Sequence, residues 1–354
     1  MNVSLAGCAV LCGVLVGACT DGMYSKNTDT GEVAETADTG ETAATDSNDT
    51  GETDSASDDT GESGDETGET DTDDSGGAVH VWIGVAMDLQ EACGRSDSGK
   101  ISCWGFPQGG NDQSPEGSWV EVEVGNYHGC AVDGSGSVAC WGAQPEHGWT
   151  HDWGKATPPA GALHGLSCGY SQSCALDVAG GVVCWGSLDD PAWVPPGGTF
   201  QQVSVGWVQA CALTEDGVVV CWGAPPRDVG DGGRYVQVTS GVEHVCALRE
   251  DGVARCWGGR YVDTAQVPEG YLFRSVAAGA ESTCGITIDG EIVCWATLAE
   301  YGYFSFIIAD APTGAGWVQV AVGSGGGCAL SEAGEIMCFG QTFNTGLDDI
   351  PEPE

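Results

Sequence analysis

A pair of cysteines ten residues apart recurs seven times between residues 93 and 338. The copy that starts at Cys211 reads Cys-Ala-Leu-Thr-Glu-Asp-Gly-Val-Val-Val-Cys-Trp-Gly, two apolar runs around a turn, which is typical of a β-hairpin. Facing residues of an antiparallel pair have Cα atoms about 4.5 to 5.5 Å apart, a distance that a disulfide can bridge. We therefore predict seven disulfides, each within its own hairpin: Cys93 with Cys103, Cys130 with Cys140, Cys174 with Cys184, Cys211 with Cys221, Cys246 with Cys256, Cys284 with Cys294 and Cys328 with Cys338.

The sequence around each hairpin is also repeated. A glycine stands six residues after every first cysteine, and an aromatic residue, Trp in six copies and Phe339 in the last, follows every second cysteine. The first cysteines are 35 to 44 residues apart. A period near 40 residues with several short strands per unit is typical of a β-propeller blade. Three strands are evident in each unit, and we expect a fourth in the Pro/Gly-rich segment after Trp-Gly.

Both faces of each predicted sheet are apolar. Alternation along a strand puts Cys211 and Leu213 on one face, and Ala212 on the other face beside Trp222. This pattern predicts sheets that pack between two neighbours, with the small Ala giving room for the large indole.

The composition excludes one class of partner and indicates a compartment. The net charge is −42 and only ten residues are Lys or Arg, so we expect no nucleic-acid binding. Regularly paired cysteines indicate an oxidising compartment, because cytosolic thiols are kept reduced. Zinc is the alternative use of paired cysteines, but its ligands usually lie two to four residues apart, so disulfides are favoured.

The first residues differ from the repeats. Residues 1–18 form a short apolar run that predicts a signal peptide. The run ends in Gly17-Ala18-Cys19, which resembles the lipobox of bacterial lipoproteins, and this resemblance implies that Cys19 is lipidated. We expect a protein anchored by lipid to the outer membrane or cell surface; the alternative is a plain secreted protein. Residues 19–78, rich in Asp, Glu, Thr and Gly, have no apolar face to bury and are predicted to be a disordered acidic linker.

We predict that residues 79–354 form one domain, and residues 79 to about 345 resemble a known repeat family. The pattern Val-x-Val-Gly-x-x-His-x-Cys-Ala-Val, followed by Gly-x-Val-x-Cys-Trp-Gly, at Val122 to Gly142 is similar to the regulator of chromosome condensation repeat, in the cysteine-bearing variety of bacterial lipoproteins. The resemblance implies an all-β, seven-bladed β-propeller. Activities of the family include nucleotide exchange on a nuclear GTPase and inhibition of β-lactamases, and none of them transfers by fold alone. An exported, acidic chain does not fit the nuclear exchange activity.

Two segments break the repeat, at residues 144–162 and 297–316. Insertions in repeat proteins form loops that often lie on the binding face, and aromatic side chains are typical of recognition sites. An alternative is that the insertions fold back and cover the propeller. A metal site is not expected, because no third spaced His accompanies the two histidines. The candidate ligand-binding residues are His147, Trp149, His151, Trp153, Tyr301 and Tyr303.

Three other residues attract attention but are expected to be structural. His128 and His244 occupy the same repeat position, so we interpret both as blade histidines. Cys168 stands where other repeats have Val, and we expect it to remain a buried thiol.

No motif of a nucleophile, metalloprotease or phosphate-binding loop occurs in the sequence. We therefore predict a protein that is not an enzyme and needs no cofactor, a cell-surface or periplasmic scaffold that binds another protein. The alternative is a carbohydrate-binding or carbohydrate-active propeller.

Overall fold

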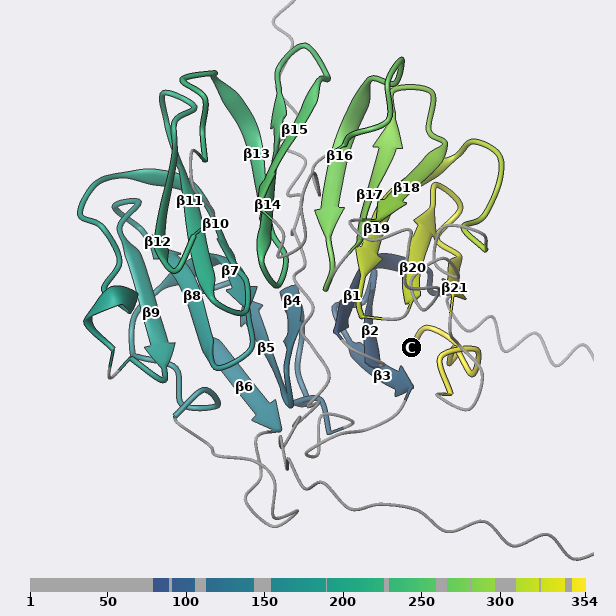
Figure 1. Cartoon of the computed structure of the whole chain (residues 1–354). Coiled ribbons are helices and arrows are strands. Elements are labelled where there is room, and N and C mark those ends of the chain that lie inside the picture. The colour runs from purple at the N-terminus through teal and green to yellow at the C-terminus, as the bar shows by residue number, and fades with distance from the viewer. Residues whose placement is uncertain are drawn as a thin grey trace, which may run out of the picture. The chain divides into compact units, whose positions relative to one another are not determined.

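The computed structural model describes residues 79–88, 91–105, 113–142, 154–188, 190–225, 229–258, 266–280, 282–296, 310–324, 326–340 and 346–354. These residues form seven antiparallel sheets of three strands, one sheet for each predicted repeat, arranged as the blades of a propeller (Figure 1). No helix in this part of the chain is long and apolar enough to cross a membrane.

The strands of each blade follow one another in sequence order. Blades 1 to 7 are β1 (Trp82–Asp88), β2 (Glu91–Ser96) and β3 (Ile101–Gly105); β4 (Trp119–Gly125), β5 (His128–Asp133) and β6 (Val138–Gly142); β7 (Leu163–Cys168), β8 (Gln172–Asp177) and β9 (Val182–Gly186); β10 (Phe200–Val205), β11 (Gln209–Thr214) and β12 (Val219–Gly223); β13 (Tyr235–Ser240), β14 (His244–Arg249) and β15 (Ala254–Gly258); β16 (Phe273–Ala278), β17 (Ser282–Thr287) and β18 (Ile292–Ala296); β19 (Trp317–Val322), β20 (Gly326–Ser331) and β21 (Ile336–Gly340).

The fourth strand that we expected in each unit is absent from the described residues, and that prediction is wrong for blade 3. There the segment after Gly186 is described except for residue 189, and it contains only a short 3-10 helix, η2 (Pro191–Trp193). Proline has no backbone N–H to donate to a ladder, and Pro191, Pro195 and Pro196 all stand in this segment. The segment therefore connects blades without extending the sheet.

All seven predicted disulfides are present, each across its own hairpin. In blade 4, Cys211 lies directly opposite Cys221, with Cα atoms 4.0 Å apart. The amide of Thr214 donates to the Val218 carbonyl at 3.0 Å. Alternation along the ladder makes the cysteines a non-hydrogen-bonded pair, the kind in which facing side chains are closest. Cys168 is a buried free thiol, as predicted.

The blades pack as the two apolar faces predicted. Cys174 and Leu176 of blade 3 form one buried cluster with Phe200, Ala212 and Trp222 of blade 4. The disulfide face of one blade thus meets the Ala and Trp face of the next, and this arrangement confirms the prediction from the repeat.

Blade 7 closes the ring against blade 1. The Gln319 side chain donates to the Val85 carbonyl at 2.9 Å and accepts from the Val85 amide at 3.2 Å. The last described segment also returns to blade 1, since Leu347 is buried in its core and Ser96 Oγ donates to the Glu354 carbonyl at 2.7 Å. Closure therefore uses side chains and the C-terminal segment, and every described sheet keeps its own three consecutive strands.

The two ends of the ring differ. We call one end the entry face. The first strands begin there, and the turns between second and third strands lie there. The other end, the exit face, carries the turns between first and second strands and the ends of the third strands. In blade 2 the pairing of Gly142 with His128 places the end of β6 beside the start of β5, on the exit face.

A row of glycines lies near the exit face, each at the end of a first strand or directly after it. A Cβ atom added to Gly125, Gly169, Gly206, Gly241 or Gly279 would lie 2.2 to 2.6 Å from the carbonyl oxygen of the glycine at the same position of the next blade. Such a distance is far shorter than any van der Waals contact. The neighbouring blades can approach this closely only because these residues lack a side chain.

Candidate functional site

The candidate ligand-binding residues in the two insertions lie outside the described residues. These are His147, Trp149, His151, Trp153, Tyr301 and Tyr303, and the lipidation candidate Cys19 also lies outside them. Their roles stay predictions. The described part of the chain contains two other regions of interest, an aromatic cluster on the exit face and a polar pocket in the centre of the ring.

The two repeat-position histidines tie neighbouring blades together. His128 Nε2 lies 2.7 Å from Ser173 Oγ of blade 3, and His244 Nε2 lies 3.0 Å from Thr283 Oγ1 of blade 6. Burial lowers the pKa of His128 to about 3, with a contribution from nearby Lys155, and lowers the pKa of His244 to about 4. Both imidazoles are therefore neutral at physiological pH and act as structural bridges.

Two groups of His, Cys and Glu side chains lie close enough together to resemble metal sites. They are His128 with Cys130 and Cys168, and Glu91 with the Cys93–Cys103 pair. Each group includes cysteine that is already in a disulfide. A disulfide sulfur is not a thiolate ligand, so neither group among the described residues forms a metal site while its disulfide is intact.

The aromatic cluster lies on the exit face of blades 2 to 4. The rings of Tyr170 and Trp207, at equivalent turns of blades 3 and 4, are 5.0 Å apart, and both side chains are half-buried. Beside them the Lys155 ammonium lies 5.6 Å from the centre of the Tyr127 ring. Tyr127 holds a positive φ of 60°, an uncommon conformation for a residue other than glycine.

Lys155 anchors the described end of the first insertion to this cluster. Its side chain is 2% exposed, and Nζ donates to the Asn126 carbonyl at 2.8 Å and to the Tyr170 carbonyl at 3.3 Å. The Lys155 carbonyl in turn accepts from Trp185 Nε1 at 3.0 Å. Residue 155 is thus fixed beside the aromatic side chains of the exit face.

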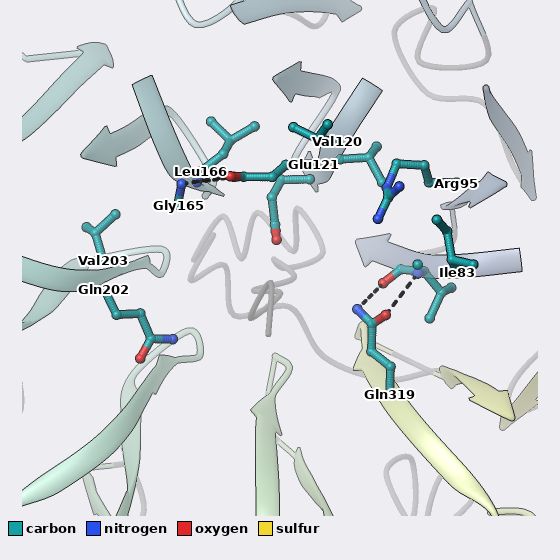
Figure 2. A pocket seen from close by; sticks show the side chains of 13 residues that line it. Ile83, Arg95, Val120, Glu121, Gly165, Leu166, Gln202, Val203 and Gln319 are labelled. Atoms are coloured by element: carbon teal, nitrogen blue, oxygen red, sulfur yellow. Dashed lines mark hydrogen bonds between the residues drawn. The ribbon is translucent and has the colours of Figure 1, made fainter. Parts of the chain in front are cut away.

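The second region is a pocket of about 110 Å³ in the central channel, toward the entry face (Figure 2). The first strands of blades 1 to 4 and blade 7 line it, together with one residue of a second strand, Arg95. Ile83, Val122 and Leu166 supply part of its apolar wall, while Arg95, Glu121 and Glu123 supply its charged groups.

Most polar side chains around the centre connect one blade to the next. In blades 2, 4, 5 and 7 the first strand carries a Gln or Glu opposite the second-strand residue that stands two positions after the first cysteine, which is Leu or Val. Gln237 exchanges two hydrogen bonds with the Val276 backbone, and Gln202 Oε1 accepts from the Val238 amide at 2.8 Å. The carboxylate of Glu121 accepts from the amides of Gly165 and Leu166 at 3.1 and 2.9 Å. These side chains serve as clamps between blades.

Blade 1 departs from this pattern in the pocket. Its pair is Gly84 opposite Arg95, so the polar group has moved from the first strand to the second. A Cβ at Gly84 would lie 3.7 Å from Arg95 Nε, which shows that the Arg95 side chain runs across the glycine. Figure 2 shows the guanidinium of Arg95 between Glu121 and Ile83 at the wall of the pocket.

Blade 2 departs from the repeated pattern at a different position of the first strand. The first-strand residue opposite the first cysteine is small in the other blades, and where it is Ser or Thr its hydroxyl accepts from a backbone amide of the next blade. In blade 2 this residue is Glu123, which is 2% exposed. Its Oε2 atom has no hydrogen-bond partner among the described residues. Burial raises the pKa of Glu123 well above its usual range, and the neighbouring charge of Glu121 raises it further.

The positive charge of Arg95 also has no acidic side chain within ion-pair distance among the described residues. No ion pair involves its guanidinium in the described part of the chain, and Glu121 attracts it only from a longer distance. Partial burial lowers the pKa of Arg95, and Glu121 raises it. The sequence motifs did not point to these two residues. An alignment of the seven repeats with one another would have marked Arg95, where the other copies have Val, Leu or Ile, and Glu123, where they have Ala, Ser or Thr.

The described residues have the fold of a β-propeller like that of the regulator of chromosome condensation (RCC1). No protein-family model matches the chain, and no curated protein matches it.

The solved structures that resemble the chain include two plant ectodomains and a yeast protein. The entire ectodomain of the receptor kinase CR4 from Physcomitrella patens is 25% identical, with a TM-score of 0.60 over 74% of this chain and 73% of that one. The CRINKLY WD40 ectodomain of the Arabidopsis thaliana receptor kinase ACR4 is 21% identical, with a TM-score of 0.60 over 77% and 99%. Prp20p from Saccharomyces cerevisiae is 20% identical, with a TM-score of 0.52 over 77% and 85%.

Proposed function

We propose that this chain is an exported lipoprotein whose disulfide-stapled propeller binds a protein partner at the outer membrane or cell surface. The seven hairpin disulfides support an oxidising environment outside the cytosol. The likeness to an ectodomain, that of CR4, fits the same kind of environment.

The binding surface that we propose is the exit face, with the two insertions. The carrying observation is that the repeated side chains pack between blades, whereas Tyr170 and Trp207 pair on the exit face and Lys155, in the described end of the first insertion, is fixed beside them. Both insertions follow third strands, which end on this face. Trp and Tyr are enriched among the few residues that dominate the binding energy of protein interfaces.

Truncation of the insertion aromatics tests this proposal. Once a partner has been isolated by pull-down with the parent protein, we expect Trp149→Ala and Tyr301→Ala each to weaken its binding at least about tenfold, because loss of a true anchor costs about 2 kcal/mol or more. The measurement is a titration of each purified variant with the partner, alongside a thermal melt that should be unchanged.

The matched control is Tyr271→Ala, because Tyr271 is an exposed aromatic residue, 45% exposed, next to the start of β16 on the entry face. It should bind as the parent protein does. The surface is wrongly assigned if Tyr271→Ala abolishes binding while the two insertion variants bind normally.

The anchor has a separate test. We expect Cys19→Ser to move the protein from the membrane fraction to the soluble fraction, because serine cannot form the thioether that carries the lipid. Fractionation followed by immunoblotting measures the distribution, and Cys8→Ser is the control that should stay with the membrane. Retention of Cys19→Ser in the membrane fraction would contradict the lipid anchor.

A further inference from the structure

The central pocket holds two polar groups that the propeller itself does not use. The Arg95 guanidinium has no ion pair or side-chain hydrogen bond in the described residues, and Glu123 Oε2 has no hydrogen-bond partner there. The pocket's other clamps, such as Glu121 and Gln319, are occupied by backbone groups of the next blade. A buried polar atom without a hydrogen-bond partner destabilises the folded state.

The other blades show that the fold does not require either group. Leu213, Leu248 and Leu330 fill the position of Arg95, and Ser167 and Ser204 fill the position of Glu123. Three departures from the repeat, at Gly84, Arg95 and Glu123, meet at one cavity. Gly84 supports the arrangement, because a longer side chain there would compete with Arg95 for the same space.

We propose that this pocket binds a small aliphatic carboxylate, with Arg95 pairing with the carboxylate and Glu123 donating a hydrogen bond to it. The planar guanidinium matches the two oxygens of a carboxylate. No acidic side chain of the described residues lies within ion-pair distance of the Arg95 guanidinium, so the blade framework leaves this group available to a bound carboxylate.

The size of the pocket sets the size of the ligand. An engineered apolar cavity of about 150 Å³ holds benzene. The present volume of about 110 Å³ suits a slightly smaller group, such as a chain of four or so carbon atoms. Ile83, Val122 and Leu166 are placed to contact such a chain, while the charged groups contact its carboxylate.

Protonation of Glu123 sets the pH dependence. Below its raised pKa the buried carboxyl is neutral and donates an O–H bond to the ligand; above it, the ionised carboxylate repels the ligand. Glu121 and Arg95 face the same pocket, and Cys168 lies close enough to be influenced by Glu123 and by Asp88. Affinity for a carboxylate should therefore fall as the pH rises through the pKa of Glu123.

The test is calorimetric titration of the full mature protein with butyrate, and with butylamine and 1-butanol as probes of matched size. We expect saturable binding of butyrate, with a dissociation constant on the order of 1 mM, and none of the other two. Arg95→Leu, which restores the residue of four other blades, should weaken butyrate binding at least about tenfold without a lower melting temperature.

A variant at Glu123 tests whether this residue donates a hydrogen bond to the ligand or has only a structural role. Glu123→Gln keeps a donor group that does not titrate, so its affinity should stay constant wherever butyrate is ionised, whereas the parent protein should lose affinity at high pH. Arg95→Lys, which keeps the charge but not the planar fork, serves if Arg95→Leu fails to fold, and it should also bind more weakly.

Three results would overturn the proposal. They are binding of butylamine in preference to butyrate, unchanged binding by Arg95→Leu or Arg95→Lys, and no saturable binding of butyrate. The outcome is independent of the protein-binding surface, which lies on the exit face.

Discussion

Reduction of the seven disulfides is expected to unfold the propeller at room temperature. Each bond joins cysteines ten residues apart and stabilises the fold by about 2 to 3 kcal/mol in the chain-entropy model. A folded domain is stable by only about 5 to 15 kcal/mol in total. Seven constraints of this size together match or exceed that margin, so short strands with frequent glycines should not hold the ring without them.

Near-ultraviolet circular dichroism during titration with a reductant measures the loss of tertiary packing. Removal of one bond, by Cys211→Ala with Cys221→Ala, should lower the free energy of unfolding by only about 2 to 3 kcal/mol. Alkylation of Cys168 reports unfolding independently, because this thiol is fully buried and its burial raises its pKa. A fully reduced protein that keeps its tertiary spectrum and protects Cys168 would show that the disulfides are dispensable.

Gly206→Ala is expected to destabilise the protein by about 3 kcal/mol, a large effect for one methyl group. The added Cβ would lie 2.2 Å from the Gly241 carbonyl oxygen of blade 5. Backbone on both sides prevents a simple rotamer change, so blades 4 and 5 would have to separate. Chemical denaturation followed by tryptophan fluorescence gives the change in the free energy of unfolding.

Gly134→Ala is the matched control, because no heavy atom lies within 4 Å of a Cβ at this position. It should change the stability by less than about 1 kcal/mol, and toward greater stability, since Ala restricts the unfolded chain. Equal stability of the two variants would show that the blades are not held at the close approach described for the glycine row.

The repeat in the sequence determined the blades, their number, the disulfide pairing and the two apolar faces. These features are local, because Cys211 and Cys221 are ten residues apart and a single hairpin brings them together. The alternation of Cys211, Ala212 and Leu213 fixes which side chains meet each neighbour. The fourth strand was predicted by analogy with other blades, and the prolines after blade 3 leave that segment without the donors that a strand needs.

The central pocket was decided only by the tertiary structure. Its walls come from first strands that are up to about 240 residues apart in the chain, from Ile83 to Gln319, and they meet because the ring closes. The sequence shows Arg95 and Glu123 as two unrelated irregularities in neighbouring repeats. Packing around one axis turns them into two unpaired groups facing a single cavity, since the first strand of every blade points its edge toward the same centre.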